Sequence, residues 1–151
     1  MVLANTGLPK NTGNMITKVA MFRNRMPQVV DAIFDVIGTI VQEVITMEDD
    51  ELVLKKRSLC DGIRLNQQFL SILGVSCNEI DEIVTIAQKH GYEAKLSGGG
   101  GGGCVICFPT NEGQVHKTQA FLDHLDEAGY EAEVVELGGE GLIIYNEWSV
   151  C

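Results

Sequence analysis

Apolar residues recur at intervals of three and four through the first half of the chain and predict four consecutive helices. A short strand at residues 2–4 precedes them. The first helix can begin on a cap at Asn11 or Thr12, the second begins at Pro27, and Asn78 is expected to cap the fourth. The predicted helices cover residues 12–26, 27–45, 51–73 and 78–90.

The second predicted helix carries apolar side chains along its whole length and is therefore expected to bury a wide stripe. The residues of this stripe are Val30, Ile33, Phe34, Ile37, Val41, Val44 and Ile45. In the first helix, the apolar residues that share one side are Ile16, Val19, Ala20 and Met21.

The second half of the chain alternates between short strands and a single helix. Residues 93–96 and 104–108 read as strands on either side of a glycine run, and a fifth helix stops at Gly129. Residues 130–137 and 142–145 are expected to form a closing hairpin. Helices beside a mostly antiparallel sheet define an α+β fold. The pattern predicts one domain over residues 1–151, with a four-stranded, ferredoxin-like sheet packed with helices.

Six consecutive glycines, Gly98 to Gly103, are the most unusual feature of the sequence. Each glycine costs roughly 0.5–1 kcal/mol of backbone entropy relative to alanine, so an ordered run indicates positive φ angles or close approach to another group. A flexible linker is the simpler interpretation, but the two flanking strands favour a site. Phosphate oxygens are common partners of such loops. Because the run should serve close approach rather than core packing, replacing Gly100 or Gly101 by valine is expected to leave the fold mostly intact.

Two familiar nucleotide motifs are excluded by the residues on the C-terminal side of the run. A dinucleotide fingerprint opens a helix, and a P-loop continues with Lys and Ser or Thr. Here the run continues as Cys104-Val105-Ile106-Cys107, a strand pattern. Cys104 and Cys107 are three residues apart on a strand, so their side chains should point to opposite faces. A shared metal site or a disulfide between them is therefore not favoured, and no metal site is assigned.

The net charge of −10 argues against nucleic acid and anionic membranes as partners. Five cysteines without a secretory signal favour a reducing, cytoplasmic location. His90, His116 and His124 are expected to be surface residues.

Three segments carry a resemblance to the mevalonate kinase family of the GHMP small-molecule kinase superfamily. They are Leu3 to Thr12 (L-A-N-T-G-L-P-K-N-T), Asn66 to Val75 (N-Q-Q-F-L-S-I-L-G-V) and Lys95 to Cys104 (K-L-S-G-G-G-G-G-G-C). The last resembles the third signature motif of the superfamily, K-L-[ST]-G-A-G-G-G-G-C, with Gly99 in place of the usual alanine. Gly7 and Gly13 stand where the family often has basic residues, which weakens the positive charge near the phosphates.

The resemblance implies transfer of the γ-phosphoryl group of ATP to the primary hydroxyl of mevalonate, in isoprenoid and sterol precursor biosynthesis. It places Thr12 and Lys10 on the substrate side. It also assigns Lys95, Ser97 and Gly98, Gly99, Gly100, Gly101, Gly102 and Gly103 to contacts with phosphates or with the other half of the enzyme. As alternatives, Thr12 is simply a helix cap and Lys10 a solvated loop lysine.

The family's upstream phosphate loop, P-x-x-x-G-L-G-S-S-A, and its catalytic Asp have no counterpart in these residues. No catalytic residue is therefore assigned here. ATP and Mg²⁺ are expected to be held mainly by an N-terminal half, which is one expected partner, a homodimer being another. The isolated chain is expected to be inactive. The alternative is a non-catalytic, stand-alone α+β module that binds a small anion or a protein.

Overall fold

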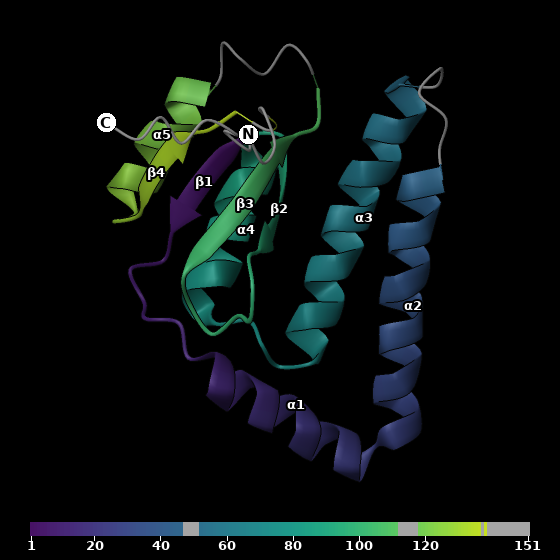
Figure 1. Cartoon of the computed structure of the whole chain (residues 1–151). Coiled ribbons are helices and arrows are strands. Elements are labelled where there is room, and N and C mark those ends of the chain that lie inside the picture. Colours follow the sequence, from purple (N-terminus) through teal and green to yellow (C-terminus); the bar gives the residue numbers. More distant parts are fainter. Residues whose placement is uncertain (47–51, 112–117, 137, 139–151) are drawn as a thin grey trace, which may run out of the picture.

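The computed structural model describes residues 1–46, 52–111, 118–136 and 138, and within these ranges it contains five helices and four strands (Figure 1). The helices are α1 (Thr12–Arg25), α2 (Pro27–Thr46), α3 (Leu52–Ile72), α4 (Asn78–Lys89) and α5 (Thr118–Glu127). The strands are β1 (Val2–Asn5), β2 (Tyr92–Leu96), β3 (Cys104–Pro109) and β4 (Glu131–Val134). The predicted closing hairpin strand at 142–145 lies outside the described residues.

The strands form one sheet in the order β2-β3-β1-β4, and each neighbouring pair is antiparallel. Val2 pairs with Cys107 of β3 on one side and with Val134 of β4 on the other, so β1 lies inside the sheet although it comes first in the sequence. The predicted α+β class with a four-stranded, antiparallel sheet is confirmed.

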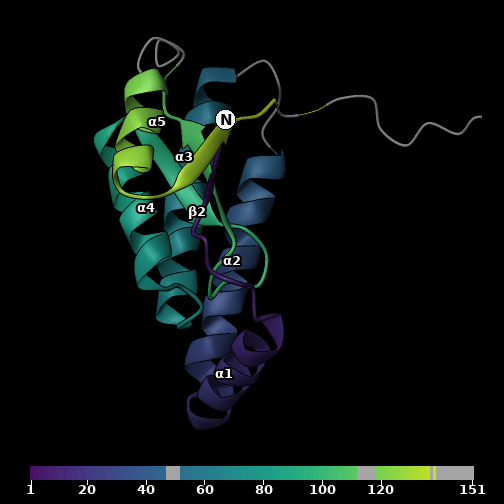
Figure 2. The same ribbon diagram turned by 90° about the vertical axis from the view of Figure 1, so that its left-hand side faces the viewer.

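Helices α4 and α5 cover one face of this sheet, as the two views show (Figures 1 and 2). Alternate strand residues point toward these helices and form the main core, because successive side chains of a strand lie on opposite faces. The buried strand side chains include Val2, Ala4, Ala94, Leu96, Val105 and Cys107, which meet Ile80, Ile83, Phe121 and Leu125.

Helix α3 runs along the edge strand β2 and is fixed there by Gln67. The buried Gln67 side chain accepts the backbone N–H of Leu96 at 2.8 Å and donates to the Ser76 hydroxyl at 3.2 Å. A hydrogen-bonding group of the sheet edge is thereby satisfied inside the protein. Helix α2 lies beside α3, and α1 crosses below the sheet (Figure 1).

Two predictions about the helices are wrong. Only Val30 and Ile33 of α2 are buried, whereas Phe34, Val41 and Ile45 of the predicted stripe are exposed. The stripe is wider than the surface that α3 and α1 cover. The cap of α4 is Cys77, which makes no side-chain capping bond, and the predicted cap Asn78 is the first helical residue.

In the described part of the chain, none of the helices combines the length and the hydrophobicity that a membrane span needs.

Candidate functional site

Two loops far apart in the sequence meet at one end of the sheet. The backbone N–H and the hydroxyl of Thr6 both donate to the carbonyl of Gly103, at 2.9 and 2.8 Å. The N–H of Gly103 in turn donates to the carbonyl of Leu8 at 3.1 Å. At the base of the glycine run, Ser97 N–H donates to the Cys104 carbonyl at 2.9 Å. The glycine run is therefore ordered and tied to the segment that enters α1.

The glycines meet requirements of the chain itself. Within the run, only Gly99 lacks a positive φ. A Cβ at Gly100, where φ is +77°, would overlap the carbonyl oxygen of Val75, and one at Gly102 would lie 2.8 Å from Leu8 Cβ. This geometry contradicts the expectation that valine at Gly100 or Gly101 leaves the fold mostly intact. The positive φ angles disfavour a β-branched residue, and the neighbouring residues of the chain leave no room for its side chain.

The loop nevertheless keeps hydrogen-bond donors for a ligand. Gly101 N–H donates to Val75 O at 2.8 Å, and Gly103 N–H is also engaged. Among the described residues, no backbone acceptor is bonded to the N–H groups of Gly98, Gly99, Gly100 or Gly102. Successive unpaired N–H groups in a glycine turn form an anion-binding concavity, because their dipoles converge on one point.

Thr12 and Lys10, the two predicted substrate-side residues, lie against this run. A Cβ at Gly99 would lie 2.9 Å from Thr12 Cγ2, and one at Gly103 would overlap the stem of Lys10. Asn11, not Thr12, is the N-cap of α1, and its side chain accepts the N–H of Asn14 at 3.1 Å. The Thr12 hydroxyl has no hydrogen-bond partner within the described part of the structure, which leaves it available to a ligand.

An apolar cavity of about 320 Å³ adjoins Thr12 and Gly99. Its other walls come from α1 and from Val75: Met15, Ile16, Val19 and Ala20 complete the lining. A polar loop edge with free donors thus borders an apolar wall, an arrangement that suits a small ligand with charged and alkyl parts.

Lys95 is not part of this cluster. It faces away from the main core because it alternates with the buried Ala94 and Leu96 along β2. Its Nζ donates to the Leu96 carbonyl at 2.9 Å, and burial lowers its pKa. Its side chain lines a separate cavity between α2 and α3.

The side chains of Cys104 and Cys107 fall on alternate faces, as predicted from their strand positions. Cys107 is fully buried in the core, and burial raises its pKa to about 12. Cys104 is partly exposed and lies on the other face.

Sequence reasoning missed a histidine pair. His90 Nε2 and His124 Nδ1 lie 2.9 Å apart, and the His90 ring packs beside Phe121. Both histidines are partly buried, so the expectation of surface residues is wrong for them, and His116 lies outside the described residues. Burial, and then the charges of His124 and Lys89, lower the pKa of His90. Only the packing of α5 beside α4 brings the pair together, so no local signal in the sequence indicates it.

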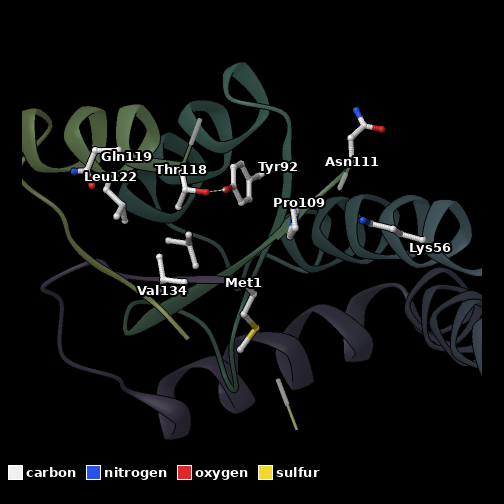
Figure 3. A pocket seen from close by; sticks show the side chains of 10 residues that line it. Met1, Lys56, Tyr92, Pro109, Asn111, Thr118, Gln119, Leu122 and Val134 are labelled. Atoms are coloured by element: carbon white, nitrogen blue, oxygen red, sulfur yellow. Dashed lines mark hydrogen bonds between the residues drawn. The ribbon is translucent and has the colours of Figure 1, made fainter. Parts of the chain in front are cut away.

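The far end of the sheet holds a larger cavity of about 560 Å³ (Figure 3). Tyr92 and Thr118, whose hydroxyls are 2.8 Å apart, form one wall, while Val134 and Leu122 contribute apolar surface. None of the predicted site residues lines it.

The family described as GHMP kinases C terminal matches residues 53–126, so this part of the chain is a GHMP kinase C-terminal domain.

Mevalonate kinases are among the curated relatives of the chain. The chain is 31% identical over 150 residues to the mevalonate kinase of Schizosaccharomyces pombe, covering 97% of this chain and 37% of that protein. It is 40% identical over 97 residues to that of Archaeoglobus fulgidus, covering 64% of this chain and 32% of the relative. The solved structure of the Methanococcus jannaschii mevalonate kinase is similar with a TM-score of 0.67 and 25% identity, over 87% of this chain and 37% of that one. The chain thus corresponds to the C-terminal part of these proteins and spans less than two fifths of their length.

Proposed function

We propose that the chain is the C-terminal part of a mevalonate kinase, which transfers the γ-phosphoryl group of ATP to the primary hydroxyl of mevalonate. The observation that carries this proposal is the packing of Lys10 and Thr12 against a glycine run with unpaired N–H groups. The pathway would be the synthesis of isoprenoid and sterol precursors, in the cytoplasm. A stand-alone anion- or protein-binding module is not favoured, because relatives that match nearly the whole chain are kinases.

Phosphoryl transfer depends mainly on positioning and on neutralising charge. ATP supplies the phosphoryl group. The unpaired N–H groups of the glycine run and the Lys10 ammonium are donors that fit phosphate oxygens, and no carboxylate of the described residues lines the cavity beside them. The Thr12 hydroxyl would hold an oxygen of the substrate against the apolar wall of α1. In this proposal, Mg²⁺ and most of the nucleotide are held by the N-terminal half of the enzyme.

The exposed apolar surface of α1 supports an N-terminal partner more than a homodimer. No residue of α1 is buried, and Ile16 and Met21 are 65% and 61% exposed. This surface adjoins the proposed ligand loop, where a second lobe would complete the cleft. We propose that residues 1–151 act as one domain that closes on that lobe. Alone, the chain should not turn over ATP.

The test is reconstitution in trans. The chain is co-expressed with the N-terminal half of a mevalonate kinase, and ATP-dependent phosphorylation of mevalonate is measured on the purified pair. We expect a complex of defined stoichiometry with activity below that of the intact relative, since an untethered interface loses effective concentration. Failure of a well-folded chain to associate with the other half would refute the proposal.

Variants of the reconstituted pair then test the site. Thr12→Val should raise KM for mevalonate by about tenfold, the value of one hydrogen bond, while Thr12→Ser retains the hydroxyl and the affinity. Lys10→Met should weaken ATP binding or turnover by roughly tenfold. Lys89→Met, at the far end of α4, is the matched control and should change neither. Equal effects of Lys10→Met and Lys89→Met would exclude Lys10 from the site.

A further inference from the structure

A groove runs between α2 and α3, outside the site described above. Its walls are Ile40, Val41, Val44 and Ile45 from α2 and Leu59, Gly62 and Ile63 from α3. Gly62 lets the two helices approach, since a Cβ there would lie 3.1 Å from Ile40 Cγ2. The groove has a volume of about 420 Å³, which is within the range of small-molecule sites. We call it the α2–α3 groove.

One end of the α2–α3 groove is polar. Among the described residues of its lining, only Lys95 and Asn66 have polar side chains. Lys95 donates one hydrogen bond, to the Leu96 carbonyl, and it forms no ion pair with any carboxylate in the described ranges. Glu93 lies two residues away on the same strand face, and its Oε1 is 3.9 Å from Nε of Arg64. The ammonium group of Lys95 is partly buried and has three N–H donors, of which one is used, so this end of the groove favours an anion.

The rest of the α2–α3 groove is apolar and partly open to solvent. Val41 and Ile45 belong to the predicted buried stripe but remain 46% and 66% exposed. From Leu59 to Asn66 the groove follows α3 for about 10 Å, at 1.5 Å of rise per residue. An alkyl chain of medium length would cover these side chains and remove their surface from water.

We propose that the α2–α3 groove binds an anionic amphiphile, with a carboxylate or phosphate-monoester head at Lys95 and Asn66 and a single alkyl chain between α2 and α3. Charge complementarity selects this ligand class, because a neutral alkyl compound leaves the Lys95 donors unpaired and a short anion leaves the apolar walls exposed. The groove shares no lining residue with the cavity beside Thr12, so this binding is independent of the phosphoryl-transfer proposal.

The test compares three probes of equal chain length, decanoate, decyl phosphate and decanol, on the full chain. Binding is measured by calorimetry below the micelle concentration of each probe, and backbone amide shifts locate it. We expect at least one of the two anions to bind about tenfold more tightly than decanol, with shifts concentrated on α2, α3 and the end of β2. Comparison of the carboxylate with the phosphate identifies the preferred head group.

Matched variants separate the head-group contact from the apolar contact. Lys95→Gln should abolish the preference for the anion over decanol, whereas Lys89→Gln, an exposed lysine of α4, should leave it unchanged. Val41→Ser should weaken the binding affinity of every probe that binds by about threefold. Val36→Ser, at a similarly exposed position of α2 outside the lining, should leave these affinities unchanged. Binding of decanol as tight as that of both anions, an anion preference that survives Lys95→Gln, or no binding of any probe would overturn the proposal.

Discussion

Replacing Gly100 by alanine tests whether the glycine run is built for the chain's own packing. At its φ of +77°, a left-handed conformation costs an L-residue about 1–2 kcal/mol. The new Cβ would also overlap the Val75 carbonyl oxygen, which would break the 2.8 Å hydrogen bond from Gly101 N–H, worth about 1 kcal/mol. The sum is about 2–3 kcal/mol, a large fraction of the typical 5–15 kcal/mol of a domain.

Gly98→Ala is the matched control. Its φ of +79° is nearly the same, but a Cβ there has no atom within 4 Å. It should therefore cost only the backbone contribution of about 1–2 kcal/mol. Urea denaturation followed by circular dichroism gives both values. The difference of about 1 kcal/mol, which is the lost hydrogen bond, should move the midpoint by roughly 0.3–1 M. Equal destabilisation by the two variants would refute the role of the Val75 contact.

Three further predictions concern stability and reactivity. Because the pKa of His90 is lowered in the fold, the unfolded chain binds more protons below pH 6.5, and stability should fall as the pH drops from 6.5 toward the folded-state pKa. His124→Gln should reduce this loss of stability, and urea midpoints measured across the same pH range test it. Gln67→Leu should cost about 1–3 kcal/mol in the same melts by leaving an edge N–H of β2 unpaired, whereas exposed Gln68→Leu should cost little. Cys107, buried and with a pKa of about 12, should resist a maleimide at pH 8 until the protein unfolds, and rapid labelling of the native protein would contradict its core position.

Local sequence patterns were sufficient to predict where α1 and α2 begin, but not which side chains of α2 are exposed. The 3.6-residue periodicity and the cap and proline signals predicted the starts of α1 at Thr12 and α2 at Pro27. The same periodicity could not show that Phe34 and Val41 stay exposed, because a wide apolar stripe does not reveal how much of it a neighbouring helix covers.

The candidate site was predictable only in part. Similarity of short segments identified Thr12 and the glycine run, but their contact depends on β1 entering the sheet beside β3. Lys95 lies near the run in the sequence, yet strand alternation directs it to the α2–α3 groove. The His90–His124 contact likewise arises only when α5 packs beside α4.

Phosphate binding by the glycine loop can be measured directly on the isotope-labelled chain. Pyrophosphate is added at millimolar concentrations and backbone amide shifts are followed by NMR. The amides of Gly98, Gly99, Gly100 and Gly102, which have no backbone partner among the described residues, should shift and saturate, while Gly101, bonded to Val75, should shift less. The chain thus contains its own control. Saturable shifts confined to the unpaired amides would support a phosphate-binding loop, and their absence, or equal shifts throughout the run, would contradict it.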